Sequence, residues 1–224
     1  MMYAQTAYPG SVGPGHAPPG WEYQLGNGVG TQVVLMFMDC TEVSLDGFAK
    51  GDVKLMFQAH SKANIPDSCF GGHGIYLILE NVVVEDDDLA VALNRSLHVQ
   101  VVRASFQDVW TEGPDYETGT WSLTNQAGQT SKITTSALGE PDTEQDTNWF
   151  LWHDSSGYFR LQFAYNSTRL NILGNPAFGD AADPLLDATI SPYYLGVGGT
   201  YQHFAVTTNL TRFDSPDCSA TPSA

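Results

Sequence analysis

The sequence is poor in positive charge. It holds 9 Lys and Arg against 25 Asp and Glu among 224 residues, a formal net charge of −16. The basic residues are scattered, and no basic stripe forms. Binding to nucleic acid depends on Lys and Arg that neutralise phosphates, and attraction to an anionic membrane surface depends on the same side chains. We therefore predict that neither a nucleic acid nor a membrane surface is a partner.

Cysteine is also scarce, with Cys40, Cys69 and Cys218 alone. An odd number at wide spacing is no disulfide framework. The sequence favours three unpaired thiols and leaves one bridge, such as Cys40–Cys69, as the alternative.

Export and membrane signals are missing as well. The first residues lack the basic and apolar regions of a secretory signal. The longest apolar run, Val33 to Met38, is far too short for a membrane span. We expect neither a signal peptide nor a transmembrane segment, and the sequence alone indicates no cellular location.

The first thirty residues differ from the rest of the chain. Residues 1–30 contain seven Gly, four Pro and a single charged residue, Glu22. Such a segment buries little surface, so it is interpreted either as a disordered tail or as an arm that orders on a neighbouring subunit. In the second case Tyr3, Tyr8 and Trp21 are the predicted anchors, since aromatic side chains carry much of the energy of such contacts. Removing residues 1–20 would then leave a folded body.

From residue 31 onward the chain reads as short apolar or alternating runs separated by Gly, Pro, Asn and Asp. Residues 52–60 alternate with a period of two, which is typical of a half-buried strand. Residues 31–39, 75–85, 96–103 and 201–213 are further predicted strands. One short helix is expected at 89–94, capped by the acidic run 86–88.

These patterns predict an all-β fold, a single jelly-roll-like β-sandwich with at most one short helix. The predicted divisions are an arm at 1–30, the sandwich at 31–213 and a flexible tail at 214–224.

Residues 148–153 and 158–165 form the clearest local unit, a hairpin whose tight turn uses Gly157. A third strand at 168–174 would complete a meander. In the first strand of the hairpin, Trp149 and Leu151 lie on one face, while Phe150 and Trp152 lie on the other. Because both faces are large and apolar, we expect both to be covered, in a sandwich or at a subunit interface.

Two groups of residues could bind metal. Cys69 and His73, with Cys40 and His60 upstream, are suitable zinc ligands, but their spacing is not that of a zinc finger. Oxygen-bearing side chains alternate along 142–148, although this segment lacks the Gly and the closing Glu of a calcium loop. We interpret the second group as an acidic surface loop and predict no metal and no cofactor.

Glu112, Asp115 and Glu117 lie between Trp110 and Trp121 and are the carboxyl groups most suited to glycoside hydrolysis. No nucleophile elbow, phosphate-binding loop, dinucleotide fingerprint or HExxH motif accompanies them. The chain is therefore predicted not to be an enzyme.

The resulting hypothesis is a structural subunit of a larger assembly, a virion or phage protein whose partners are other protein subunits. It rests on the arm, the two-sided aromatic strands and the acidic, Lys-poor composition. A carbohydrate-binding, lectin-like module with a glycan partner is the alternative, and a glycoside-active enzyme is the third possibility.

Overall fold

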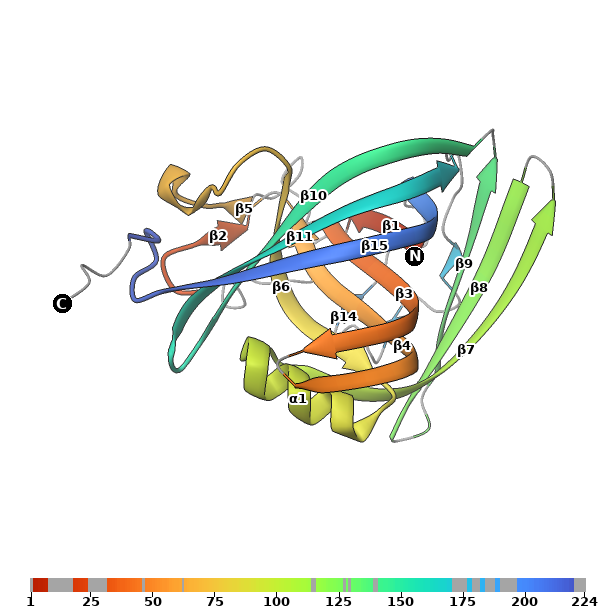
Figure 1. The fold of residues 1–224 in the computed structure, drawn as a ribbon, viewed down its shortest axis with the longest axis horizontal. Coiled ribbons are helices and arrows are strands. Elements are labelled where there is room, and N and C mark those ends of the chain that lie inside the picture. Colours follow the sequence, from red (N-terminus) through yellow and green to blue (C-terminus); the bar gives the residue numbers. More distant parts are fainter. Residues whose placement is uncertain are drawn as a thin grey trace.

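The computed structural model describes most of the chain (Figure 1). The described residues are 2–7, 18–23, 32–45, 47–61, 63–113, 116–126, 128, 130–138, 141–170, 177–178, 182–183, 188–189 and 197–219.

These residues form mainly β-strands. In chain order the elements are β1 Met2–Ala7, β2 Glu22–Tyr23, β3 Gln32–Leu45, β4 Phe48–Ser61, β5 Ala63–Asn64, a 3₁₀ turn Asp67–Cys69, β6 Ile75–Val84, α1 Asp87–Leu97, β7 Val101–Gly113, β8 Tyr116–Asn125, β9 Thr130–Leu138, β10 Pro141–Asp154, β11 Gly157–Leu170, β12 Ala177–Phe178, β13 Ala182–Asp183, β14 Ala188–Thr189 and β15 Val197–Phe213. The predicted all-β class with one short helix is confirmed within this described part.

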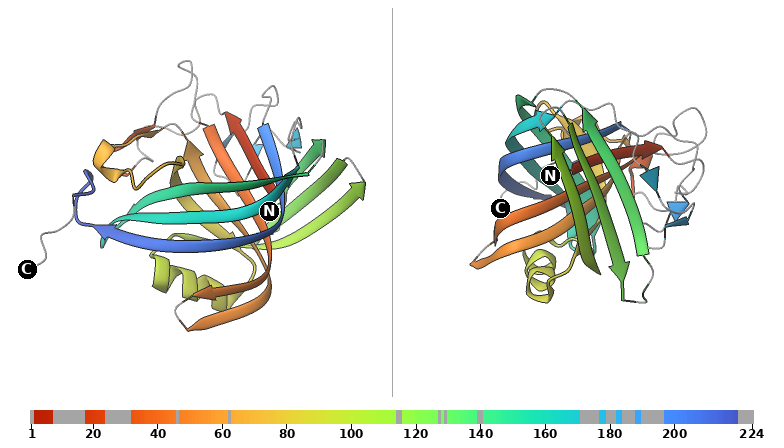
Figure 2. Two further views of the ribbon diagram at one scale, coloured as in Figure 1. Left: turned by 45° about the horizontal axis from the view of Figure 1, so that its top comes forward. Right: turned by 90° about the vertical axis from the view of Figure 1, so that its right-hand side faces the viewer.

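One large curled sheet dominates the described residues. Its eleven strands run in the order β10-β11-β15-β1-β3-β4-β6-β7-β8-β9-β12. The sheet curls so far that β10 also pairs with β6, in parallel, from Asn148 opposite Ile75 to Leu151 opposite Ile78. Figures 1 and 2 show the resulting open, barrel-like shape. The finer prediction of a jelly-roll sandwich is not confirmed, because one sheet that curves on itself buries its inner face without a second sheet.

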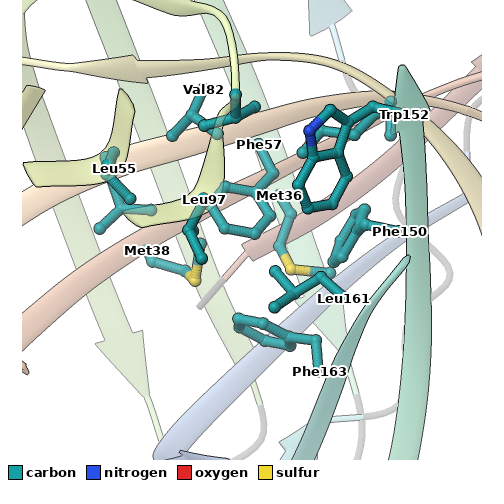
Figure 3. Packing of buried hydrophobic residues seen from close by; sticks show 14 of the residues in the cluster. Met36, Met38, Leu55, Phe57, Val82, Leu97, Phe150, Trp152, Leu161 and Phe163 are labelled. Carbon is teal, nitrogen blue, oxygen red and sulfur yellow. The ribbon is translucent and has the colours of Figure 1, made fainter. Parts of the chain in front are cut away.

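The inner face of the curled sheet holds the main hydrophobic core (Figure 3). The period-two pattern of β4 places Val53, Leu55 and Phe57 on this face, as the sequence predicts. The Phe57 ring meets the Phe150 and Phe163 rings edge to face, at centroid distances of 5.1 and 5.7 Å. Aromatic pairs in this geometry stabilise a core beyond the area that they bury.

Helix α1 covers part of the same core. Its N-terminus is capped by Asp86, whose carboxylate accepts a hydrogen bond of 2.8 Å from the Leu89 backbone N–H. Leu89, Leu93 and Leu97 follow at helical spacing and are buried in the core. The predicted helix is therefore confirmed. The strand predicted at 96–103 begins late, at Val101, because Leu97 is used by the helix and His98 ends it in the left-handed conformation.

The outer face of the sheet is covered as well. Strands β7, β8 and β9 continue past the curled part and form the green wing of Figure 1. From this wing the Trp121 ring packs on Phe37 of β3 at 5.0 Å and meets Phe106 edge to face at 6.3 Å. Trp121 and Phe37 are completely buried. A second apolar layer thus lies behind the first.

Strands β10 and β11 form the predicted hairpin. Asp154 pairs with Gly157, whose φ of 146° is a conformation that glycine adopts easily. Phe150 lies in the inner core, and Trp149 lies in a separate outer cluster, so both faces are covered within one chain. Of the third strand predicted at 168–174, residues 168–170 belong to β11 itself, and residues 171–174 lie outside the described residues. The other described neighbour of β11 is β15.

The N-terminal residues take part in the sheet. Strand β1 lies between β3 and β15, and the backbone of Tyr3 pairs with Met36 on one side and Gly199 on the other. Residues 2–7 contain no Gly or Pro, so they can form a ladder. Tyr8 lies outside the described residues. Among those residues, no helix is long and apolar enough to cross a membrane.

The Phe57→Ala substitution tests the aromatic core. Removing a buried phenylalanine ring costs about 3–5 kcal/mol, because its contacts are lost and a cavity remains. Urea unfolding should show a decrease of this size in the free energy of unfolding. Val91→Ala is the control, since Val91 is exposed on α1, and it should change that free energy by less than about 0.5 kcal/mol. Equal effects of the two substitutions would contradict the assigned core.

Deleting residues 1–20 tests the position of β1. The expectation from sequence was an intact body, whereas removal of β1 leaves facing edges of β3 and β15 without their partner. At a net contribution of about 1 kcal/mol per hydrogen bond, we expect a loss of at least about 3 kcal/mol in the free energy of unfolding. Deleting residues 220–224, which lie beyond the described chain, is the control. An unchanged unfolding midpoint after the first deletion would refute this placement.

Candidate functional site

An open cavity of about 620 Å³ lies where β6 changes neighbours. Residues 75–78 of β6 pair with β10, and residues 82–84 pair with β7. Between these two stretches the edge of β6 is free of both strands. The cavity is lined there by residues 78–80 of β6, 98–100 after α1 and 152–154 of β10. A gap between diverging strands is a recurrent position for ligand sites in sheets.

A β-bulge places Glu80 in this gap. Gln58 of β4 pairs with Asn81, and the next residue, Ala59, pairs with Leu79, so Glu80 is an extra residue without a counterpart. A bulge turns the extra residue out of the regular alternation and is common next to functional sites. The Glu80 side chain is 24% exposed and lines the cavity.

Buried polar side chains hold the Glu80 carboxylate. His60 Nε2 lies 2.6 Å from Glu80 Oε2, and Gln58 Nε2 donates to the same oxygen at 3.0 Å. The Gln58 side-chain oxygen in turn accepts a hydrogen bond of 3.1 Å from Asn81. Gln58 and His60 are completely buried. Hydrogen bonds to a charged acceptor are stronger than neutral ones, so this network fixes the orientation of Glu80.

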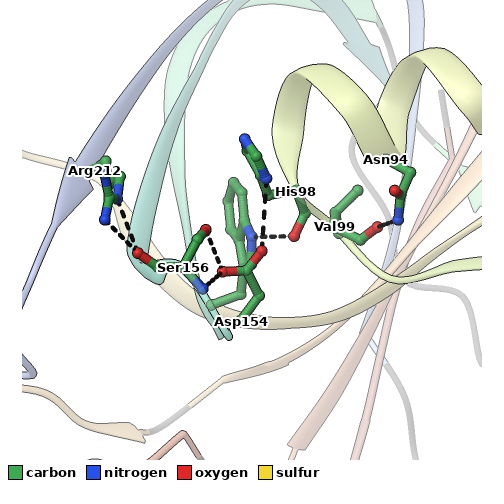
Figure 4. A network of polar contacts seen from close by, with 7 residues as sticks. Asn94, His98, Val99, Asp154, Ser156 and Arg212 are labelled. Atoms are coloured by element: carbon green, nitrogen blue, oxygen red, sulfur yellow. Dashed lines mark hydrogen bonds and ion pairs between the residues drawn. The ribbon is translucent and has the colours of Figure 1, made fainter.

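A second carboxyl–imidazole pair lines the cavity from β10 and the end of α1 (Figure 4). His98 Nδ1 lies 3.7 Å from Asp154 Oδ2, and the Trp152 indole N–H donates to the His98 carbonyl oxygen at 3.1 Å. Burial alone would raise the pKa of Asp154. Hydrogen bonds from the Ser156 hydroxyl and backbone N–H, together with the nearby His98, outweigh burial and hold that pKa below its usual 3.8.

The lip of the cavity, residues 18–21, is formed by the chain's own N-terminal part. Pro18 and Pro19 line the cavity, and the Tyr158 hydroxyl donates to the Pro19 carbonyl oxygen at 2.9 Å. Trp21 is only 3% exposed and packs on Tyr158 with ring centroids 5.4 Å apart. Its indole N–H donates to the Pro216 carbonyl oxygen at 2.7 Å. Trp21 was expected to anchor a neighbouring subunit, but its side chain is used within its own chain.

A disulfide bond joins Cys69 and Cys218. The favoured prediction of three free thiols is wrong, and so is the alternative Cys40–Cys69 bridge. The pairing is non-local, over a sequence separation of 149, which no spacing pattern reveals. Burial raises the pKa of the free Cys40 thiol to about 11. Residues 214–219, expected to fray, are held by this bond beside Trp21.

The four residues considered for zinc do not form a site. Cys69 is oxidised in the disulfide, His60 is bound to Glu80, and the exposed His73 offers its backbone oxygen to the Trp149 indole at 3.1 Å. Within the described ranges no group of three His, Cys, Asp or Glu residues could hold a metal ion. The absence of metal from the protein itself stays a prediction for metal analysis.

The other acidic segments fall on strands. Residues 142–148 belong to β10, so their alternation is the period of a strand rather than the spacing of an acidic loop. Glu112 and Glu117 pair across the β7–β8 hairpin. Asp115 lies outside the described residues.

Sequence reasoning missed Glu80, His98 and Asp154 as a group. One signal was present, because Glu80 and Asn81 interrupt the otherwise apolar strand 75–84. The bulge and the change of neighbours along β6 depend on non-local pairing, and no local pattern encodes them.

No protein-family model matches the sequence, and a comparison with curated proteins finds no match. Among solved structures, one from structural studies of acetoacetate decarboxylase is similar, with a TM-score of 0.57 and 13% sequence identity. The likeness covers 95% of this chain and 86% of that chain. At this identity it shows the fold alone.

This likeness corrects the function predicted from sequence. The hypothesis of a virion structural subunit is wrong, since the fold is one found in an enzyme and Trp21 serves its own chain. The lectin-like module and the glycoside-active enzyme, which were its alternatives, gain nothing from this fold. The predictions that protein subunits or glycans are partners, and that nucleic acids and membranes are not, stay untested.

The lowered pKa of Asp154 predicts a pH dependence of stability. A depressed folded-state pKa stabilises the protein above the unfolded-state value of 3.8, and this stabilisation is lost as the pH falls through the lower folded-state pKa. In Asp154→Asn the group no longer titrates. The difference in Tm between the wild type and this variant should therefore narrow as the pH falls below ~3.8. Thermal unfolding followed by circular dichroism measures this difference in Tm. A difference that stays constant from pH ~4 down to pH ~2 would contradict the lowered pKa of Asp154.

Proposed function

We propose that the cavity binds a small neutral or cationic organic molecule and that Glu80 is its principal hydrogen-bond acceptor. The observation that carries this proposal is the fixed Glu80 carboxylate at the cavity wall. Within the described residues both of its contacts, from His60 and Gln58, fall on Oε2. The other oxygen, Oε1, is available to a ligand.

The size and lining of the cavity support a small organic ligand. About 620 Å³ falls within the 300–1,000 Å³ that is typical of small-molecule sites. Leu79, Val99 and Trp152 contribute apolar surface, and Gln100 adds an amide. Such a combination of apolar walls with a few placed polar groups binds a ligand by shape and orients it by hydrogen bonds.

The charge of the lining selects among ligands. Glu80 and Asp154 bring two carboxyl groups to the cavity, and no Lys or Arg of the described chain lines it. A carboxylate ligand would face two carboxyl groups, with only the imidazoles of His98 and His153 in the lining to compensate, which disfavours it. An alcohol or an amine meets no such repulsion and can donate a hydrogen bond to Glu80.

Decarboxylation of acetoacetate is therefore not carried over from the similar structure. Acetoacetate is an anion, and covalent catalysis on its carbonyl group would need a lysine amine with a lowered pKa. A side-chain hydrogen bond with Asp86 instead raises the pKa of Lys50. Lys54 is bound to Asp108. The side chains of Lys62 and Lys132 are not described.

General acid–base catalysis on the bound molecule is a second candidate function. It is favoured by the two carboxyl–imidazole pairs, Glu80 with His60 and Asp154 with His98, that meet at one cavity. Paired groups of this kind can accept and return a proton during a reaction. The prediction from sequence that the chain is not an enzyme stays untested.

Thermal-shift measurements with three sets of size-matched compounds test the binding proposal. Alcohols and amines should include compounds that raise Tm, and carboxylates should not. Glu80→Gln should weaken the best of these ligands about 10- to 100-fold, since a hydrogen bond to a charged group contributes about 1.5–3 kcal/mol. Glu85→Gln, at an exposed carboxyl outside the cavity, is the matched control and should bind normally.

Two results would refute the proposal. One is preferential stabilisation by carboxylates. The other is equal affinity of the Glu80→Gln and Glu85→Gln variants for every compound that binds.

A further inference from the structure

The lip of the cavity is connected to the disulfide bond by a short series of contacts. The lip residues Pro18 and Pro19 line the cavity, and Trp21 donates its backbone N–H to the Pro18 carbonyl oxygen at 3.0 Å. The Trp21 indole N–H then reaches the Pro216 carbonyl oxygen at 2.7 Å. Pro216 lies two residues before Cys218. Two hydrogen bonds and a two-residue stretch of backbone thus join the lip to the disulfide.

The lip contacts the C-terminal segment, residues 215–219, closely. A Cβ atom at Gly20 would lie 2.7 Å from the Pro216 ring, so the Gly20 backbone packs directly against that ring. The Ser68 hydroxyl donates to the Asp217 carbonyl oxygen, and the Cys218 backbone N–H donates to the Ser215 carbonyl oxygen at 3.0 Å. This segment follows the last strand, and among the described residues it joins no sheet. It is therefore attached to the rest of the chain by the hydrogen bonds from Trp21 and Ser68 and by the bond of Cys218.

The opposite end of the disulfide is anchored firmly. Arg160 Nη1 donates to the Cys69 carbonyl oxygen at 2.8 Å, and the Arg160 guanidinium lies over the Trp149 ring at 5.4 Å. Cys69 is therefore fixed to the outer face of β10 and β11. Because Cys69 is fixed, the disulfide holds the C-terminal segment in place, and this segment in turn holds the lip through Trp21.

We propose that oxidation of Cys69 and Cys218 completes the ligand cavity by fixing its lip. This inference deepens the proposed function and rests on it. Before oxidation the C-terminal segment is held only by a few hydrogen bonds, and Trp21 lacks a fixed partner at Pro216. The lip then keeps its contacts with Tyr158 but loses its fixed support at Pro216, so it opens locally more often and Glu80 becomes more accessible.

The chemical step is a thiol–disulfide exchange with a small disulfide oxidant. One cysteine thiolate attacks the oxidant and releases one thiol, and the second cysteine then displaces the other thiol to form the Cys69–Cys218 bond. The two cysteines lose two electrons and two protons in total, and the oxidant is reduced to two thiols.

The environment of the sulfurs makes this a step of maturation rather than a reversible switch. Cys69 is completely buried and Cys218 is 5% exposed, so a reductant has little access to the finished bond. The free Cys40 keeps its thiol protonated, because its burial disfavours the thiolate that exchange requires. It does not compete for either partner.

Labelling of the Glu80 carboxyl measures the opening of the lip. The probe is glycine ethyl ester coupled by a water-soluble carbodiimide, with the labelled positions quantified by peptide mass spectrometry. Full-length oxidised protein is compared with Cys218→Ser, with Trp21→Phe and with Cys40→Ser as the matched control. Trp21→Phe removes the indole donor to Pro216 and keeps a smaller aromatic ring against Tyr158. The exposed Glu85 serves as the internal reference.

Glu80 labelling, relative to Glu85, should increase by about threefold or more in Cys218→Ser and should increase in Trp21→Phe, because both free the lip. Cys40→Ser should match the wild type. Labelling is done well below each Tm, and circular dichroism must show an unchanged β signal. This condition matters because loss of a long-range disulfide also lowers global stability.

Unchanged labelling of Glu80 in Cys218→Ser would overturn the inference. Global unfolding of that variant would overturn it too, because the bond would then hold the whole fold rather than the lip. Neither result depends on ligand binding, so the proposed function is judged separately by the thermal shifts of Glu80→Gln. Increased labelling of Glu80, together with no change in Tm on addition of any ligand, would support the role of the disulfide in fixing the lip and would refute the binding function.

Discussion

Strand β6 is shared by three neighbours, and the remainder of the described structure is arranged around this strand. It pairs with β4 along one edge, and its other edge is divided between β10 and β7. Parallel strands cannot be joined by a tight turn, so both pairings require long connections. Helix α1 supplies one of them and covers the core on its way. The other brings the hairpin β10–β11 around the molecule, and the sheet curls as a consequence.

The divided edge of β6 also explains the position of the candidate site. The pairing of β6 with β10 ends at Ile78, and its pairing with β7 begins at Val82. Between these two residues the sheet has a gap, which side chains either fill or leave open. The bulge at Glu80 puts a carboxyl group there instead of an apolar side chain. His60 and Gln58 come from the neighbouring strand β4, so the same pairing that makes the gap also supplies the residues that fix the carboxylate.

Fold and chemistry diverge in this protein. The likeness to an acetoacetate decarboxylase structure extends over nearly the whole chain, yet the cavity is lined by carboxyl and imidazole groups. A fold supports many different sites, so function follows from the side chains placed in it. Here the excess of acidic residues continues into the cavity itself. The disulfide and Trp21 also fix the lip of that cavity, where residues 18–21 contact residues 215–219.

The sequence by itself determined the elements whose signal is local. The alternation in 52–60 defined the inner face of β4, the acidic run at 86–88 capped α1, and Gly157 marked the hairpin turn. It also indicated that both faces of β10 are covered. Only the tertiary structure decided which strands pair, that Cys69 meets Cys218, and that Trp21 is buried in its own chain. These contacts join residues far apart in the sequence, so no local pattern encodes them. A strand in a sandwich and a strand in a curled sheet both alternate with a period of two, so the alternation does not distinguish the two folds. Glu80, His60, His98 and Asp154 became one site for the same reason, because pairing and not spacing brings them together.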